Sequence, residues 1–228
     1  MYTNVNFSAP LGVLTFLGTG FVMFLAGVFL IYSLIVRKYG RARLAVFAAV
    51  AVAAVYLAIV LVFSVSSSEK VLARGEEKHF CEIDCHLAYS IADVRQTKTI
   101  GSAPNQATAA GLFTIVTLKT RFDETTISSR RGDAWLTPNS RVVTVIDEQG
   151  RRFAPSAAAQ NVLEQAGLNG KPLMTALRPG ESYTTTLVFD LPADIRNPTL
   201  LMNEGEWVTH LIIGHENSPL HKTTRFQL

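Results

Sequence analysis

The sequence predicts two transmembrane helices followed by an all-β, immunoglobulin-like antiparallel sandwich with one short helix. Three observations support this fold class: two long uncharged runs near the N-terminus, a series of short alternating segments with turn residues between them, and a single later stretch with helical periodicity. We divide the chain into a membrane part (residues 1–66), a tether carrying a Cys-x3-Cys-His junction (67–86) and an outer sandwich domain (87–228).

The membrane part contains two runs, residues 11–36 and 44–65, that have no Asp, Glu, Lys, Arg or His. At about 1.5 Å per residue, each run can cross a hydrocarbon layer of about 30 Å as a helix. The first ten residues contain no Lys or Arg, and the first run exceeds the apolar core of a signal peptide, so we expect it to be retained. Ionisable groups inside the membrane are typical of transporters and pumps, so neither function is expected.

A basic connector, residues 37–43, predicts the orientation of the two helices, because short basic loops stay in the cytoplasm. It holds four cations, Arg37, Lys38, Arg41 and Arg43. We therefore expect a two-pass protein of the bacterial inner (plasma) membrane, with both termini and the sandwich extracytoplasmic, in the periplasm. Small residues four apart predict either a tight hairpin or a homodimer seam on the second helix: Ala45, Ala49 and Ala53.

Charge is unevenly distributed along the chain. Of 21 Lys and Arg residues, four lie in the connector, and the other 17 are balanced by 18 Asp and Glu residues, the first of which is Glu69. The outer domain therefore lacks the basic excess that nucleic-acid binding requires. The expected partners are the lipid bilayer and a protein of the membrane or cell envelope.

The outer domain shows strand-type segments separated by turn signals. Tyr183, Thr185, Leu187 and Phe189 alternate most clearly. We predict strands at residues 87–97, 113–122, 141–146, 183–190, 199–202, 207–213 and 223–228, and loops at 99–110 and 125–140.

One helix interrupts this strand pattern. Ser156 can cap it and Gly167 can end it. Its apolar face would carry Ala159, Val162, Leu163 and Ala166.

Two motifs carry a resemblance to known proteins: Leu177-Arg178-Pro179-Gly180-Glu181-Ser182 and Leu187-Val188-Phe189-Asp190-Leu191-Pro192. This pattern resembles the signature of a broad family of bacterial immunoglobulin-like domains of unknown function over residues 87–228. The resemblance implies a membrane-anchored extracytoplasmic sandwich and no catalytic residues. The layout also resembles subunit II of haem-copper oxidases, but there the cysteine pair ends the domain, so we assign no oxidase role.

The junction contains both cysteines of the chain, Cys81 and Cys85. In an extended strand their Cα atoms would lie about 13 Å apart, whereas the Cα atoms of a disulfide usually lie roughly 4.4–6.8 Å apart. Any joint use therefore needs a turn through Glu82, Ile83 and Asp84.

Two uses of the cysteine pair remain open. The first is a structural disulfide. The second is a thiol redox role or a copper or zinc site, in which the thiolates join histidines. That metal site requires the first and last strands to run in parallel, which would bring Cys81, Cys85 and His86 toward His215 and His221, with His79 as a further candidate.

Other polar and aromatic residues have simpler structural interpretations. His210 alternates with apolar neighbours and is predicted to be a structural strand residue. Trp135 and Trp207 are predicted to pack, and Arg130 and Arg131 to lie in a solvated loop. The sequence has no nucleophile elbow, phosphate loop or zinc-protease motif, so we expect no enzymatic activity and no cofactor.

Two functional hypotheses follow. The first is a membrane-anchored binding or assembly module with a structural disulfide. The second is an extracytoplasmic copper, zinc or thiol redox protein.

Overall fold

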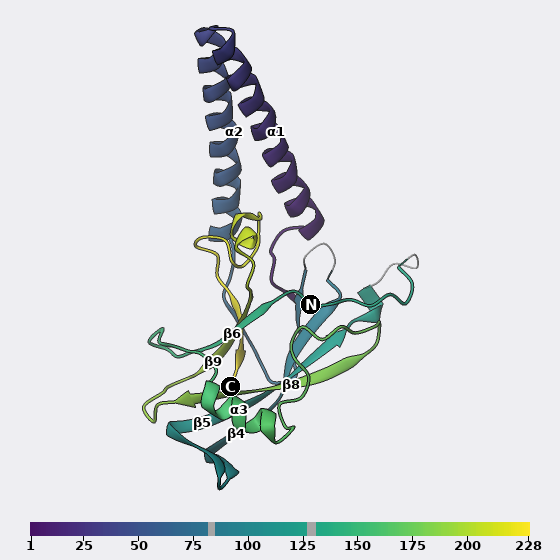
Figure 1. The fold of residues 1–228 in the computed structure, drawn as a ribbon, viewed down its shortest axis with the longest axis vertical. Coiled ribbons are helices and arrows are strands. Elements are labelled where there is room, and N and C mark those ends of the chain that lie inside the picture. Colours follow the sequence, from purple (N-terminus) through teal and green to yellow (C-terminus); the bar gives the residue numbers. More distant parts are fainter. Residues whose placement is uncertain (82–84, 127–130) are drawn as a thin grey trace. The chain divides into compact units, whose positions relative to one another are not determined.

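The computed structural model describes residues 1–81, 85–126 and 131–228 (Figure 1). The chain divides into two compact units. We call Val5–Ser68 together with Trp207–Lys222 the membrane unit. We call Met1–Asn4, Glu69–Glu206 and Thr223–Leu228 the sandwich unit.

The membrane unit contains the two predicted membrane helices, α1 (Ala9–Ile35) and α2 (Tyr39–Val65). Each has 27 residues and is long and apolar enough to cross a membrane. At about 1.5 Å per residue each is about 40 Å long. Helix α2 begins before the predicted run, so Arg41 and Arg43 lie in its first turns rather than in the connector.

The two helices pack against each other along small residues. On α2, Ala42 and Ala45 are buried and Ala49 and Ala53 are half-buried. On α1, the buried Ser33 donates a hydrogen bond to the Phe29 carbonyl, which satisfies its hydroxyl within the helix. Of the predicted small-residue face, Ala45 is therefore buried within a helical hairpin.

The rest of the membrane unit is the segment Trp207–Lys222. The strand predicted at residues 207–213 is wrong, because Trp207–Leu211 forms the 3-10 helix η2. The apolar residues in this segment alternate as they would in a strand, but here they do not face a sheet. Tyr56 of α2 donates a hydrogen bond to the Leu211 carbonyl, so this segment packs on the helices rather than joining a sheet.

The sandwich unit consists of two five-stranded sheets. The first has the order β1 (Tyr2–Thr3), β3 (Lys78–Phe80), β4 (Leu87–Ser102), β5 (Asn105–Phe122) and β8 (Ser182–Leu191). The second has the order β2 (Lys70–Leu72), β10 (Thr224–Gln227), β9 (Thr199–Glu204), β6 (Arg141–Ile146) and β7 (Arg152–Phe153). The sandwich prediction is confirmed, although the β1–β3 and β2–β10 pairs are parallel.

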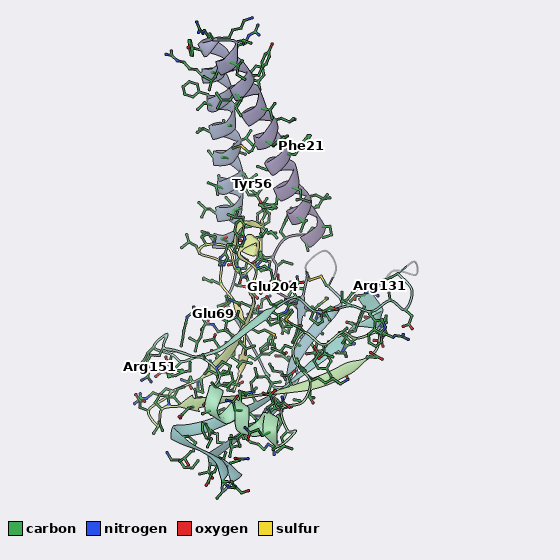
Figure 2. All side chains as sticks on the ribbon, viewed as in Figure 1. Phe21, Tyr56, Glu69, Arg131, Arg151 and Glu204 are labelled. Carbon is green, nitrogen blue, oxygen red and sulfur yellow. A yellow bond between two sulfur atoms is a disulfide. The ribbon has the colours of Figure 1, made fainter. Side chains whose placement is uncertain are left out.

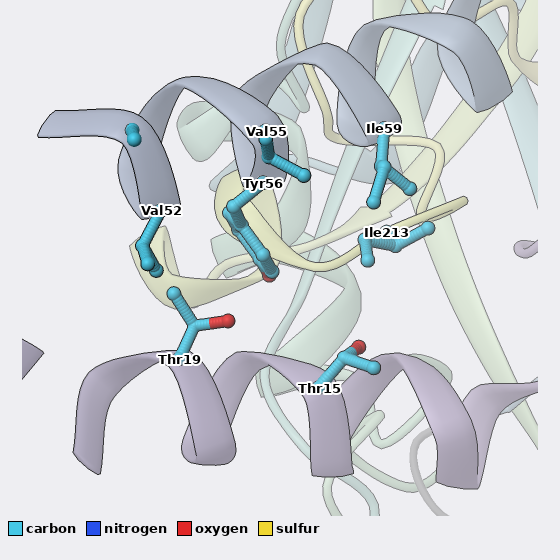
Figure 3. A pocket seen from close by; sticks show the side chains of 8 residues that line it. Thr15, Thr19, Val52, Val55, Tyr56, Ile59 and Ile213 are labelled. Carbon is cyan, nitrogen blue, oxygen red and sulfur yellow. The ribbon is translucent and has the colours of Figure 1, made fainter. Parts of the chain in front are cut away.

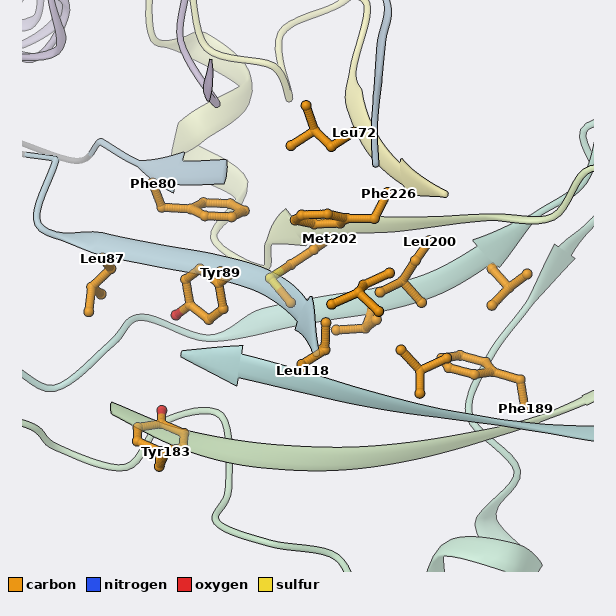
Figure 4. Close-up of a cluster of buried hydrophobic side chains, with 14 of the residues drawn as sticks. Leu72, Phe80, Leu87, Tyr89, Leu118, Tyr183, Phe189, Leu200, Met202 and Phe226 are labelled. Carbon is orange, nitrogen blue, oxygen red and sulfur yellow. The ribbon is translucent and has the colours of Figure 1, made fainter. Parts of the chain in front are cut away.

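The core of the sandwich is formed by side chains that alternate inward from both sheets (Figure 4). Each large apolar side chain that is fully buried stabilises the fold by about 1.5–3 kcal/mol. The first sheet contributes Tyr89, Leu118 and Phe189, and the second contributes Leu200, Met202 and Phe226.

A second, smaller cluster explains why the loop predicted at residues 99–110 is wrong. Strands β4 and β5 continue through this stretch as a long hairpin, with Thr99 paired to Thr108. Ile100 and Phe113 on the hairpin pack against Ala159 and Leu163 of α3 (Ala157–Gln165). The helix itself is confirmed, beginning after Ser156 and ending before Gly167, whose φ is +68°.

Strands β2 and β3 lie within the stretch predicted to be a tether. They form because Leu72 and Phe80 are buried in the sandwich core. The last strand has a parallel neighbour, as expected, but that neighbour is β2 and not β4, since Thr224 pairs with Lys70. The strand pairing assumed for the metal hypothesis is therefore wrong.

The described ranges contain two 3-10 helices. One is η1 (Glu124–Thr126), which overlaps the start of the loop predicted at residues 125–140. The other is η2 of the membrane unit, described above.

Candidate functional site

Cys81 and Cys85 form a disulfide, and their Cα atoms lie 4.1 Å apart. Cys81 is 2% exposed and directly follows β3, while Cys85 stands two residues before β4. Because β3 and β4 are antiparallel and pair Phe80 with Leu87, the disulfide closes the end of this strand pair. The turn predicted through Glu82, Ile83 and Asp84 lies outside the described residues.

A network of ion pairs and hydrogen bonds surrounds Asp123, immediately beyond β5. His79 Nε2 lies 3.1 Å from Asp123 Oδ2. Arg121 Nη2 lies 3.3 Å from the same oxygen and also binds Glu77 in a bidentate pair of 2.8 and 2.7 Å. Thr125 donates to Asp123 Oδ1 from both its amide and its hydroxyl. The aspartate is therefore held from several sides.

This network shifts the protonation equilibria of its members. Burial alone would raise the pKa of Asp123, but hydrogen bonds from Thr125, His79 and Arg121 hold that pKa well below its usual range. The hydrogen bond from Arg121 lowers the pKa of Glu77. The same carboxylates raise the pKa of Arg121. All three groups are therefore charged at neutral pH.

The N-terminal residues contribute a buried link next to the disulfide. The Asn4 side chain accepts a 2.7 Å hydrogen bond from the Cys81 amide and donates one of 3.0 Å to Oε1 of Glu204. Glu204 is labelled in Figure 2. Asn4 also donates from its backbone amide to the His79 carbonyl. The chain before α1 is thereby joined to β3 and β9.

Two buried cations near this link escaped the sequence analysis. Lys78 is 0% exposed, and its Nζ donates to the carbonyls of Met202 and Thr224 at 3.0 Å each. Arg141 Nη1 lies 3.9 Å from Glu204 Oε1, and its guanidinium lies over the Phe80 ring. Lys78 therefore links the two sheets. The only signal of its burial in the sequence is its place two residues before Phe80, in a stretch too polar to suggest burial.

The histidines of the metal hypothesis belong to different units. His86 is in the sandwich unit, where Nδ1 lies 2.7 Å from Thr126 Oγ1 and the ring stacks on Phe122. His215 and His221 are in the membrane unit. His215 Nδ1 accepts a hydrogen bond from the Asn217 amide, and burial lowers the pKa of His221.

The metal hypothesis gains no support from these positions. Across residues 1–81, 85–126 and 131–228, no three His, Cys, Asp or Glu side chains gather as a metal site would need. In the disulfide, moreover, neither sulfur is the thiolate that ligates metal. The copper or zinc site of Cys81, Cys85, His86, His215 and His221 stays a prediction.

A cleft of about 360 Å³ opens on the sandwich unit. Its polar lining includes Gln160 of α3 and the exposed Lys171, and its apolar lining includes Leu173 and Met174. Thr185 of β8 donates a hydrogen bond to the Lys171 carbonyl, which fixes one wall of the cleft. Hydroxyl, amide, ammonium and apolar groups together suit a polypeptide segment better than a purely apolar ligand.

Several predicted roles change in the structure. Trp135 is 56% exposed, with the Arg178 guanidinium 4.6 Å from its ring centre, and Trp207 is 70% exposed, so neither tryptophan is packed in the core. His210 is exposed on η2 rather than placed on a strand. Arg131 donates to the Ala134 carbonyl, and Arg130 lies outside the described residues.

No protein-family model matches the chain, and no curated protein is similar to it. Among solved structures, a secreted protein of Mycobacterium tuberculosis, MPT63, has a TM-score of 0.43 at 14% identity, covering 72% of this chain and all of that one. A conserved hypothetical protein of Bacillus anthracis has a TM-score of 0.39 at 13% identity, covering 52% and 82% of the two chains. An uncharacterised β-sandwich protein of Clostridium difficile has a TM-score of 0.38 at 8% identity, covering 72% and 96%.

Proposed function

We propose that this chain is a two-pass, membrane-anchored, extracytoplasmic binding or assembly module whose Cys81–Cys85 disulfide is structural. The observation that carries the proposal is the pairing of β1 with β3. Strand β1 precedes the first helix and β3 follows the second, so two crossings return the chain to the side on which it began. The basic residues between the helices favour a cytoplasmic turn, and a disulfide is typical of an oxidising compartment.

We further propose that the cleft is the surface that binds a protein partner of the membrane or cell envelope. It combines the flexible apolar side chain of Met174, which is 52% exposed, with the ammonium group of Lys171. Methionine is common at protein-binding surfaces, and the charged rim group would orient the partner.

Cysteine labelling in intact spheroplasts tests the orientation. Lys38→Cys reports on the turn between the helices and Gln149→Cys on an exposed turn of the sandwich. A membrane-impermeant maleimide should label Gln149→Cys at once and Lys38→Cys only after permeabilisation. The native cysteines stay silent because they are joined to each other. The reverse pattern would place the sandwich in the cytoplasm and overturn the proposal.

The state of the cysteines separates this module from a redox or metal protein. The purified full chain should contain no free thiol before reduction and no stoichiometric copper or zinc. Bound metal that is lost in Cys81→Ser would instead support the redox or metal hypothesis.

A photo-cross-linking amino acid at Met174 tests the cleft. It should yield a discrete adduct in membranes of the producing cell, and Lys171→Glu should weaken that adduct. The matched control is the same amino acid at Val71, which is 53% exposed but belongs to β2 and does not line the cleft. Equal adducts from both positions would show that the cleft is not the docking surface.

A further inference from the structure

We propose that the segment Trp207–Lys222 inserts into the lipid leaflet on the sandwich side of the membrane, so that lipid acyl chains and headgroups are its binding partner. We call it the interfacial segment. This inference rests on the membrane anchoring proposed above and adds to α1 and α2 a further element that contacts the bilayer.

The interfacial segment contacts α2 well inside the helix. Tyr56 Oη donates a 2.7 Å hydrogen bond to the Leu211 carbonyl. Tyr56 precedes the helix end at Val65 by nine residues, which is about 14 Å along the axis. Arg43 is the last cation before the apolar run, and about 20 residues beyond it span the hydrocarbon layer. By that measure Tyr56 and Leu211 lie below the outer boundary of the layer.

The segment also extends between the two helices. Ile213 lines an apolar cavity of about 360 Å³ together with Thr15 and Thr19 of α1 and Ile59 of α2 (Figure 3). A Cβ added to Gly12 of α1 would lie 3.1 Å from the Ile213 carbonyl oxygen, so the glycine permits this close approach. The apolar part of the segment therefore lies alongside residues within α1 and α2, and not beyond the ends of these helices.

Polar contacts near the helix ends hold the middle of the segment, at Gly214, and its C-terminal end, at Lys222. The Asn6 amide donates to the Gly214 carbonyl at 2.8 Å, and the Asn6 side chain donates to the Phe63 carbonyl at 2.7 Å. The Lys222 amide donates to Ser67 Oγ at 2.8 Å, just past α2. Polar groups thus lie toward the helix ends, whereas Leu211 lies deeper, as an element that dips into the bilayer requires.

Several polar groups of the segment bond to one another, as polar groups placed in hydrocarbon require. Ser218 Oγ donates to the Ile212 carbonyl at 2.8 Å, and the Asn217 side chain donates to Thr209 Oγ1 at 2.8 Å. The His215 amide donates to the Ile212 carbonyl at 3.2 Å. These bonds pair polar groups of Ser218, Asn217 and His215 with other groups of the same segment.

The exposed side chains of the segment include two large apolar ones, Trp207 and Leu220, beside the polar His210 and Lys222. Trp207 is 70% exposed and Leu220 is 74% exposed. Tryptophan is enriched at the membrane–water interface because its ring is apolar and its N–H seeks a polar partner. A bilayer would cover both side chains, and a tryptophan at this position also supplies its own probe.

Fluorescence quenching by brominated lipid tests the inference on the full chain. Trp135→Phe leaves Trp207 as the single tryptophan. In vesicles of phosphatidylcholine brominated on the acyl chain, we expect at least a twofold loss of Trp207 emission relative to unbrominated vesicles. Leu220→Trp in a chain whose two native tryptophans are replaced by Phe should show a similar loss, which keeps the test valid if one variant folds poorly.

A helix reporter separates failure of this inference from failure of the anchoring. Phe21 is 62% exposed on α1, and Phe21→Trp replaces it in the same tryptophan-free background. Quenching at position 21 but not at 207 or 220 would overturn the inference and leave the anchoring intact. Quenching at none of the three positions would overturn both.

A separate variant tests whether Leu211 lies at the depth of Tyr56 in the bilayer. Tyr56→Phe removes only the hydroxyl that donates to Leu211, so quenching of Trp207 should fall as the segment moves outward. Tyr32→Phe removes an exposed hydroxyl from α1 and should leave the quenching unchanged. Equal quenching of Trp207 in the Trp135→Phe chain with and without Tyr56→Phe would overturn the assignment of Leu211 to the level of Tyr56.

Discussion

At the scale of a single residue, Asp123 shows how neighbouring side chains stabilise a negative charge in the sandwich unit, close in sequence to the end of β5. Its carboxylate accepts two hydrogen bonds from Thr125 and lies within 3.3 Å of both His79 and Arg121. These interactions lower the pKa of Asp123 below the usual value for a carboxyl group. The negative charge therefore helps to link the end of β5 to β3 across the intervening strand β4.

Asp123→Asn should destabilise the sandwich unit by about 2 kcal/mol, because the charged partner of His79 and Arg121 is lost. A carboxylate with a lowered folded-state pKa stabilises the fold above its unfolded pKa of about 4 and loses that contribution as the pH falls further. The gap between wild type and variant should therefore narrow below about pH 4. Thermal unfolding of the detergent-solubilised chain, followed by Trp135 fluorescence in a Trp207→Phe background, measures both effects.

Glu124→Gln is the matched control for this prediction. Glu124 is exposed and its Oε2 lies 3.7 Å from Arg121 Nη1, so its loss should cost less than about 0.5 kcal/mol. An equal effect of the two variants, or a gap that does not depend on pH, would contradict the role given to Asp123.

The disulfide gives a second prediction at the residue scale. Replacing both Cys81 and Cys85 by Ser should lower the free energy of unfolding by about 2 kcal/mol, since the closed loop is short. The double variant should be insensitive to reductant, whereas the wild type should lose the same stability on reduction. A wild type unaffected by reductant would argue against a stabilising disulfide.

Single residues were the hardest features to predict from the sequence. Cys81 and Cys85 were predictable as a candidate pair because they are the two cysteines of the chain and lie four residues apart, so that one turn can bring them together. Lys78 was not, because its burial depends on carbonyls of β9 and β10, more than a hundred residues away. Trp207 was misplaced for a related reason: its surroundings belong to the membrane unit, which no local pattern in residues 207–213 indicates.

At the scale of elements, the long β4–β5 hairpin is stabilised by its contact with α3. Gly101 adopts a φ of +80°, and a Cβ there would meet the Asn105 carbonyl and lie 2.6 Å from Val162 Cγ1 of the helix. The hairpin and the helix therefore approach more closely than any side chain at position 101 would allow.

Gly101→Ala should destabilise the sandwich unit by about 3 kcal/mol, because strain in the left-handed region adds to the clash with backbone and helix. Gly75→Ala is the control. Gly75 has a φ of +85° but nothing within 4 Å of an added Cβ, so it should cost only about 1 kcal/mol. Urea unfolding followed by Trp135 fluorescence compares the two, and equal costs would show that the hairpin does not pack on α3 as described.

Elements with a strong local signal were predicted well. Helices α1 and α2 follow from uncharged length alone, and α3 from its periodicity between Ser156 and Gly167. Strands β2 and β3 were missed because each has only three residues and is stabilised by partners distant in sequence. The far half of the β4–β5 hairpin was missed because its Gly, Ala, Ser and Pro content is typical of loops, while its stability comes from the cluster with α3.

On the scale of the whole molecule, the first four residues belong to the sandwich unit although two membrane helices separate them from it in sequence. Strand β1 pairs with β3, and Asn4 links Cys81 to Glu204. The first sheet is therefore complete only when the residues before α1 and those after α2 come together.

Asn4→Ala tests this dependence at a single side chain. The substitution leaves the Cys81 amide and Glu204 Oε1 without the Asn4 contact, so the sandwich unit should lose about 2–3 kcal/mol of stability. Asn6→Ala is the control two residues along the chain, since the Asn6 side chain bonds Phe63 in the membrane unit and should leave the unfolding of the sandwich unchanged. Trp135 fluorescence during thermal unfolding in detergent measures both variants. If Asn4→Ala and Asn6→Ala unfold alike, the N-terminal strand does not stabilise the sandwich, and the same-side argument for the two termini loses its structural basis.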